Sequence, residues 1–223
     1  GLLRFPRKAP RKPIALLKVI IALGGRNVPM ARVLDSLWPD EEGDRAYHAF
    51  GLALHRLRKL LGSNDAVLLD QSRLSLNPKW VWTDVERLHQ VLQEVLETGN
   101  PQPLFAVYAG HLLADSDEYS WVLPARDRLR ARFIRAICDV ARRSESVGEH
   151  HRARSWYEQA LQVDPFSEDL AQGLMRCHVE LGERLKAEAV LAALQSRLSA
   201  DSRRTLSSQT KSLVKRLALD GEA

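Results

Sequence analysis

The chain has 223 residues, 45% of them hydrophobic, and a net charge of +5, which excludes global disorder and allows one large or two small domains. No run of about 18 apolar residues occurs, so no membrane contact is expected. The only two cysteines, Cys138 and Cys177, lie far apart in the sequence. This spacing argues against a disulfide framework and favours a cytoplasmic protein.

Positive charge is concentrated in the N-terminal third. Residues 1–62 hold 12 Lys and Arg against 5 Asp and Glu, whereas the remaining residues hold 21 against 23. This asymmetry predicts an anionic partner at one end of the chain only. A solvated basic surface is the plain alternative, because exposed charged faces are common.

Proline and glycine punctuate the N-terminal third. Pro13 suits the first turn of a helix, and Gly24 with Gly25 ends it. Pro29 opens a second helix, which ends before Pro39 because proline cannot continue a helix. An acidic loop at 40–44 precedes a third helix. The elements expected here are a short strand at 2–5 and helices at 13–23, 29–37 and 44–61.

The third helix has one apolar and one basic side. Its apolar residues follow one another at intervals of four, four, three and four, which is typical of a buried helical stripe; they are Ala46, Phe50, Leu54, Leu57 and Leu61. The other side carries Arg45, His48, His55, Arg56 and Lys59, with Arg58 on the flank. A helix fits the major groove of DNA, where Arg and Lys donate to guanine or to phosphates.

Two short segments, 66–69 and 74–76, predict a hairpin whose turn lacks glycine. Arg73 near its tip is a candidate phosphate contact, together with Lys12 and Lys18 on the first helix.

The rest of the chain is predicted to be helical. Residues 80–82 are a short strand or a linker, and Thr83 with Glu86 forms a capping box before the next helix. The domain boundary therefore falls near residues 77–84. Further helices are expected at 85–96, 103–108 and 122–143, with breaks near Gly110, Gly148, Pro165, Gly182 and Asp201.

A 34-residue step relates two later segments. It takes Gly148 to Gly182 and Ala153 to Ala187, and it takes two further apolar positions, Tyr157 and Ala160, to Leu191 and Leu194. Glycine at a turn, small residues at helix contacts and a closing Pro165 resemble a tetratricopeptide repeat, which has this length. Each helix pair cannot bury its apolar face alone, so such pairs stack.

Two families resemble this chain and together cover almost all of it. Residues 4–82 resemble the OmpR/PhoB-type winged helix of the SARP (antibiotic regulatory protein) family of bacterial activators, through Arg11-Lys12, Leu16-Leu17, Gly25 to Val28, Leu34, Leu37 to Asp40, Ala46, Phe50 and Leu54 to Leu61. Residues 83–220 resemble the bacterial transcriptional activator domain (BTAD), through Asp84, Tyr108 to Leu113, Trp121, Arg126, Leu129, Gly148, Ala153, Tyr157, Ala160-Leu161 and Asp164-Pro165.

The resemblance implies a mainly α fold: a winged helix-turn-helix domain at 1–82, and an all-α, tetratricopeptide-like domain at 83–223. It places helix 44–61 in the major groove, with DNA contacts from Ala53, His55, Arg56 and Arg58, and a hairpin wing on the minor groove or backbone. The family's N-terminal sheet has several strands, whereas this sequence offers at most one. The loop at 40–44 lies where related winged helices contact RNA polymerase.

Other chemistries find little support in the sequence. His48 and His55 share a helix face but have no further metal ligand at a suitable spacing. No phosphate-binding loop and no catalytic motif occurs, so neither a cofactor nor an enzymatic activity is expected.

The predicted function is a DNA-binding transcription regulator, most simply an activator. Its expected partners are double-stranded DNA, RNA polymerase and a second copy of the chain. The helical domain would serve dimerisation, partner binding or polymerase contact. The alternative is a tetratricopeptide-like interaction adaptor, or a signalling module of a larger protein, that does not bind DNA.

Overall fold

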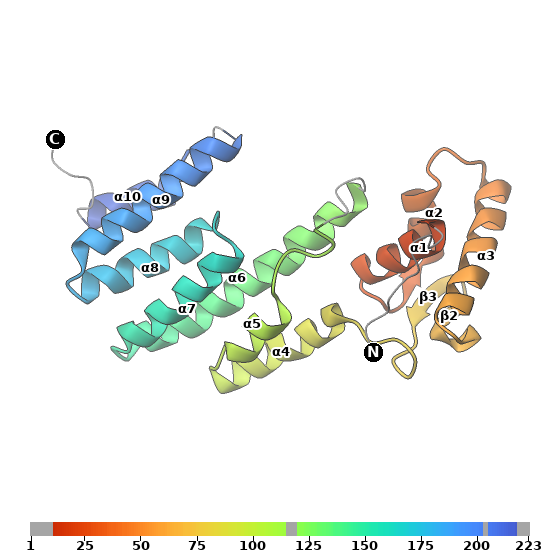
Figure 1. Cartoon of the computed structure of the whole chain (residues 1–223), viewed down its shortest axis with the longest axis horizontal. Coiled ribbons are helices and arrows are strands. Elements are labelled where there is room, and N and C mark those ends of the chain that lie inside the picture. Colours follow the sequence, from red (N-terminus) through yellow and green to blue (C-terminus); the bar gives the residue numbers. More distant parts are fainter. Residues whose placement is uncertain (1–10, 115–119, 203–204, 218–223) are drawn as a thin grey trace. The chain divides into compact units, whose positions relative to one another are not determined.

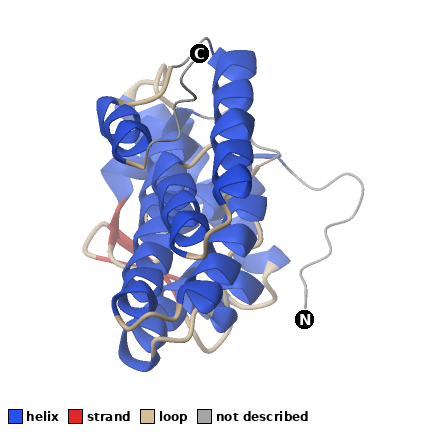
Figure 2. Ribbon diagram, turned by 90° about the vertical axis from the view of Figure 1, so that its left-hand side faces the viewer, coloured by secondary structure: helices blue, strands red, loops and turns tan. Residues whose placement is uncertain are grey.

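A computed structural model describes residues 11–114, 120–202 and 205–217. The chain is mainly helical, and its strands are short (Figure 2). It divides into two compact units: an N-terminal unit, Gly1–Arg87 with Leu112–Asp127, and a helical unit, Leu88–His111 with Arg128–Ala223. The strand expected at 2–5 lies outside the described residues. In the described part of the chain, no helix has an apolar stretch long enough to cross a membrane.

The N-terminal unit combines three helices with a small antiparallel sheet (Figure 1). The strand order is β1-β3-β2, so the central strand is the last in sequence. The helices are α1 (Arg11–Ala22), α2 (Met30–Leu37) and α3 (Gly43–Leu60), with a 3-10 turn at Asn64–Ala66; the strands are β1 (Val28–Pro29), β2 (Val67–Asp70) and β3 (Arg73–Leu76).

One hydrophobic core joins these elements. The apolar stripe of α3 packs with α1 and with the inner face of the sheet, where Leu57 and Leu74 are completely buried. The segment Leu112–Asp127 belongs to the same unit, and its Trp121 packs against this core. The unit is therefore built from two pieces of the sequence.

The predicted hairpin is present, and its turn has a backbone conformation that residues other than glycine rarely adopt. Gln71 and Ser72 both have positive φ, at 43° and 59°. This left-handed pair matches the two-residue turn whose twist suits a hairpin, although glycine or asparagine usually occupies it. Asp70 and Arg73 face each other directly across the turn.

Residues 80–82 form no strand in the structure. Val81 is buried, but Trp80 and Trp82 are 56% and 70% exposed. The segment leaves β3 through a turn in which the backbone N–H groups of Trp80 and Val81 both donate to the Asn77 carbonyl. The capping box is only half formed: Thr83 accepts from the Glu86 backbone N–H at 3.2 Å, but the Glu86 carboxylate pairs with Arg26 instead of reaching back.

Seven further helices follow in the described part of the chain, and α7, α8 and α9 lie side by side (Figure 1). They are α4 (Asp84–Thr98), α5 (Gln102–Val107), α6 (Leu123–Ser146), α7 (His150–Val163), α8 (Glu168–Glu180), α9 (Arg184–Ser202) and α10 (Ser208–Arg216), with a 3-10 turn at Ser120–Val122.

The 34-residue step appears in the helix boundaries. Helices α6 and α8 end at Ser146 and Glu180, while α7 and α9 begin at His150 and Arg184. Gly148 and Gly182 occupy the intervening turns with φ of 81° and 73°, where a side chain would be strained. The interior positions on α7 and α9 are buried in both helices: Ala153, Tyr157, Ala160, Ala187, Leu191 and Leu194.

The polar contacts of the two turns also repeat with this step. Glu149 accepts from Ser144 at 3.4 Å and from Arg152 at 3.1 Å. Glu183 lies 34 positions after Glu149. It contacts His178 and Lys186, which lie 34 positions after Ser144 and Arg152, each at 2.7 Å. Hydrogen bonds from Lys186 and His178 lower the pKa of Glu183 to about 2. The repeat thus includes the carboxylate that ties each turn to the helices beside it.

A glycine lets α7 and α8 approach closely. A Cβ added at Gly173 would lie 2.2 Å from the Tyr157 ring. That ring cannot easily move, because its hydroxyl donates to Glu145 at 2.6 Å, and Glu145 also accepts from Arg176 at 3.0 Å. Burial raises the pKa of the Tyr157 hydroxyl above its usual range, so the phenol remains a donor.

A charged side chain fastens α3 to the sheet. The Arg58 guanidinium donates twice to the Val67 carbonyl, from Nε at 2.9 Å and from Nη2 at 2.7 Å. Because Val67 begins β2, these bonds hold the hairpin against the end of α3.

We expect Arg58→Ala to destabilise the N-terminal unit by about 1–2 kcal/mol, since it removes two charge-assisted hydrogen bonds. Amide hydrogen exchange over α3 and the hairpin of the full chain would measure this loss. The control is Arg56→Ala, an exposed neighbour, which should change stability by less than about 0.5 kcal/mol. Equal effects of the two substitutions would contradict the assignment.

Glycine-to-alanine substitutions at two helical positions should have opposite effects. Gly173→Ala forces a methyl group into the Tyr157 ring and should cost about 3 kcal/mol. Gly51→Ala, where an added Cβ meets nothing within 4 Å, should stabilise α3 by about 0.5–1 kcal/mol through helix propensity. Amide hydrogen exchange in each unit reports both changes, and a neutral Gly173→Ala would refute the close approach.

Candidate nucleic-acid interface

The exposed side of α3 is the most distinctive surface of the N-terminal unit. Six exposed residues recur on it at helical spacing, over about 21 Å of helix. We call this surface the α3 face; its residues are Arg45, His48, Leu52, His55, Arg56 and Lys59. Five of the six carry hydrogen-bond donors, and all five are residues that the sequence predicted.

The opposite side of the same helix is anchored in the core. Phe50 and Leu57 are 2% and 0% exposed, and Ala46, Ala53 and Leu54 are buried beside them. Because the apolar stripe fixes the rotation of α3, the α3 face must point to solvent. The DNA contact expected from Ala53 is corrected by this burial: its methyl group lies in the core and its side chain is inaccessible.

Arg58 lies on the flank of α3 and is only partly exposed. Its guanidinium donates to the Val67 carbonyl, which gives it a structural role, and the DNA contact expected from it stays a prediction. The sequence could not show this structural role, because the acceptor belongs to a strand beyond the helix end.

The two lysines of α1 also have partners within the protein. Lys12 donates to the Leu37 carbonyl at 2.7 Å and lies 5.1 Å from the centre of the Trp38 ring. It thereby places a positive charge at the C-terminus of α2, where the helix dipole favours cations. Lys18 is partly buried and also interacts within the protein.

Arg73 is exposed at the start of β3, next to the hairpin turn. Its Nη1 donates to the Asn27 carbonyl at 3.2 Å, which holds the side chain towards β1. Between Arg73 and Asp70 the turn presents two exposed polar residues, Gln71 and Ser72. The tip of the hairpin is therefore polar, and its cation, Arg73, is hydrogen-bonded to the neighbouring Asn27.

Leu52 was not predicted as part of the α3 face. Leu52 is 48% exposed and lies four residues after His48 and four before Arg56. This spacing was readable from the sequence. An exposed leucine, however, has no donor that would mark it as a contact.

The acidic loop between α2 and α3 is solvent-exposed, as its composition predicts. In the described residues, no three His, Cys, Asp or Glu side chains are grouped so that they could hold a metal ion. The cysteines are buried, and burial raises the pKa of Cys138 to about 11 and that of Cys177 to about 12. Both thiols are therefore protonated and packed in the interior.

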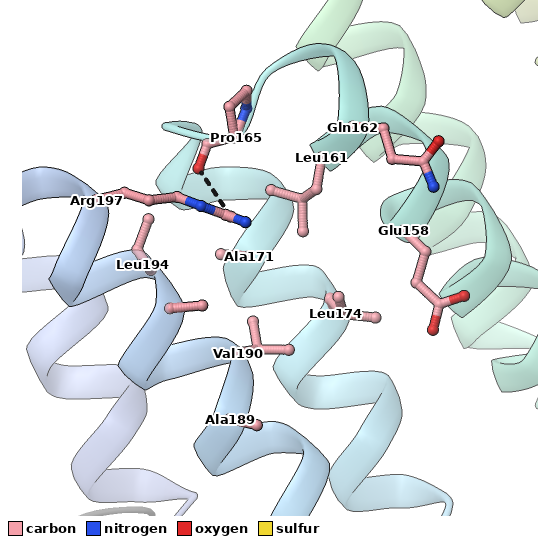
Figure 3. A pocket seen from close by; sticks show the side chains of 11 residues that line it. Glu158, Leu161, Gln162, Pro165, Ala171, Leu174, Ala189, Val190, Leu194 and Arg197 are labelled. Atoms are coloured by element: carbon pink, nitrogen blue, oxygen red, sulfur yellow. Dashed lines mark hydrogen bonds between the residues drawn. The ribbon is translucent and has the colours of Figure 1, made fainter.

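The helical unit has an open groove of about 560 Å³ between α7, α8 and α9 (Figure 3). Its floor is apolar, with Ala171 and Leu174 from α8 and Val190 from α9. Glu158 and Arg197 provide charges on opposite sides, and Arg197 donates to the Pro165 carbonyl at 3.5 Å. Such a surface suits an apolar ligand or segment more than a reacting group.

The chain is similar to known proteins both in sequence and in fold. Residues 105–218, just over half of the chain, match the bacterial transcriptional activator domain. No curated protein matches the sequence. The structure is similar to that of Mycobacterium tuberculosis EmbR in complex with a low-affinity phosphopeptide, with a TM-score of 0.62 and 16% identity.

That similarity covers 94% of this chain and 59% of the EmbR chain. At 16% identity, this similarity shows only that the two chains share a fold. The present chain thus spans less than two thirds of the EmbR chain. The family match rests on the region in which the 34-residue step, the turn glycines and the buried α7 and α9 positions were found. The chain therefore belongs to the bacterial transcriptional activator domain family.

Proposed function

We propose that the chain is a DNA-binding transcription regulator that inserts α3 into the major groove of DNA. The observation that carries this proposal is the α3 face, where five donor residues are exposed on one side of a helix whose other side is fixed in a core. Family membership supports a role in transcription regulation.

In this proposal residues 1–82 are a winged helix of the OmpR/PhoB type, followed by a BTAD at 83–223. The three helices followed by an antiparallel hairpin support that identification. Arg45, His48, His55, Arg56 and Lys59 are the proposed groove and phosphate contacts, and Arg73 at the hairpin is a candidate backbone contact. Lys12, Lys18 and Arg58 remain candidate DNA contacts, although Lys12 and Arg58 already donate to backbone carbonyls within the protein.

For the helical unit we propose a contact role: dimerisation, RNA polymerase or another partner. The apolar groove between α7 and α9 supports it, because nothing in the described part of the chain fills that space. An interaction adaptor without DNA binding is the competing function, and DNA titration separates the two.

Binding of the full chain to duplex DNA should weaken steeply with salt, because cations on α3 would displace counterions from phosphates. Fluorescence anisotropy with a pool of random-sequence duplexes, from about 50 to 200 mM salt, measures this dependence. Arg56→Ala should weaken binding about 5- to 100-fold if the guanidinium contacts a base, or lower the salt slope by about one if it contacts a phosphate.

The matched control is Arg216→Ala, which removes an exposed arginine from α10 in the helical unit. It should leave both affinity and salt slope unchanged. Absence of binding to any duplex at about 50 mM salt would refute the DNA-binding proposal and favour the adaptor.

A further inference from the structure

An apolar side chain lies at the centre of the otherwise polar α3 face. Leu52 is 48% exposed, and the neighbouring positions on the helix surface are His48, His55 and Arg56, at four before, three after and four after. Arg45 and Lys59 lie seven residues to either side. The donors therefore surround Leu52 on both sides along the helix.

The core does not require this leucine. Leu52 is absent from the hydrophobic cluster that holds α3, whose buried residues lie on the other side of the helix. Scattered exposed leucines are normal on protein surfaces. Leu52 differs from them in its position, because any surface that the five donors approach must also meet its side chain.

The major groove of DNA offers one apolar group to such a side chain. Each base pair presents donors and acceptors there, and only thymine adds a methyl group. A leucine placed against a donor or acceptor would desolvate it without replacing its hydrogen bond, which is unfavourable. Placed against a thymine methyl, it buries apolar surface on both partners.

We infer that Leu52 is a specificity-determining residue that selects a thymine by contact with its C5 methyl group. This inference rests on the proposed insertion of α3 into the major groove. The surrounding cations hold the helix on the DNA, and Leu52 makes the site prefer thymine at one position.

The test removes the proposed contact once from the DNA, by deleting the thymine methyl group, and once from the protein, by truncating Leu52. The preferred site is first selected by the full chain from random duplexes, and each thymine in it is then replaced singly by deoxyuridine, which lacks only the methyl group. At one position this replacement should weaken wild-type binding about 4-fold, the effect expected for one buried methyl group. For Leu52→Ala, the same replacement should have no effect.

Two further variants separate this contact from general effects. Leu52→Met keeps an apolar side chain of similar volume and should retain the 4-fold sensitivity. Leu185→Ala removes an exposed leucine in α9, 81% exposed, and should behave as wild type. Amide hydrogen exchange over α3 in each variant checks that this helix remains folded.

The outcomes distinguish this inference from the function on which it depends. If the full chain selects no sequence and binds no duplex, both fail. If a site is selected but no thymine shows a methyl effect that Leu52→Ala abolishes, the Leu52 contact is overturned, while DNA binding stands. Selection of a site that contains no thymine would likewise overturn the Leu52 contact and leave DNA binding in place.

Discussion

Burial of the apolar stripe of α3 is the constraint on which the proposed function depends. The stripe packs with α1 and the sheet, and its Leu57 has no exposed surface. A helix anchored along one side cannot rotate without exposing that surface to water, at about 25 cal/mol for each Å². The core of the N-terminal unit therefore determines which residues form the α3 face, and it does so before any DNA is present.

The same unit uses several of its cations for its own structure. Arg58 binds the Val67 carbonyl, Lys12 caps α2 at Leu37, and Arg26 pairs with Glu86. Each contact joins two different elements. Arg58 joins α3 to β2, Lys12 joins α1 to the end of α2, and Arg26 joins a loop to α4. Positive charge in the first 62 residues thus overstates the charge available to an anionic partner. Three exposed cations, Arg45, Arg56 and Lys59, lie along one side of α3.

The helical unit is organised by a repeat that is both apolar and polar. Turn glycines with positive φ set the direction of each following helix, and carboxylates at the 34-residue step tie the turns to both neighbours. The contact between Gly173 and Tyr157 has no equivalent in the other repeat, where Leu191 takes the place of Tyr157. Gly173 lets α8 approach the Tyr157 ring of α7, and the hydrogen bond to Glu145 holds that ring in place. These contacts leave the groove between α7 and α9 open on the surface.

Most helices, the hairpin, the 34-residue step and the polar members of the α3 face could be predicted from the sequence, because each depends on a local period or on turn residues. Element boundaries agree within a few residues, whereas residues 80–82 were ambiguous because a short apolar segment can form either a strand or a loop. Ala53 lies three residues after Phe50 and four before Leu57, so its burial follows the same period. The internal bonds of Arg58 and Lys12, and the place of Leu112–Asp127 in the N-terminal unit, are visible only in the fold. Their partners, Val67, Leu37 and the core around Trp121, lie outside any local period, so only folding brings them together.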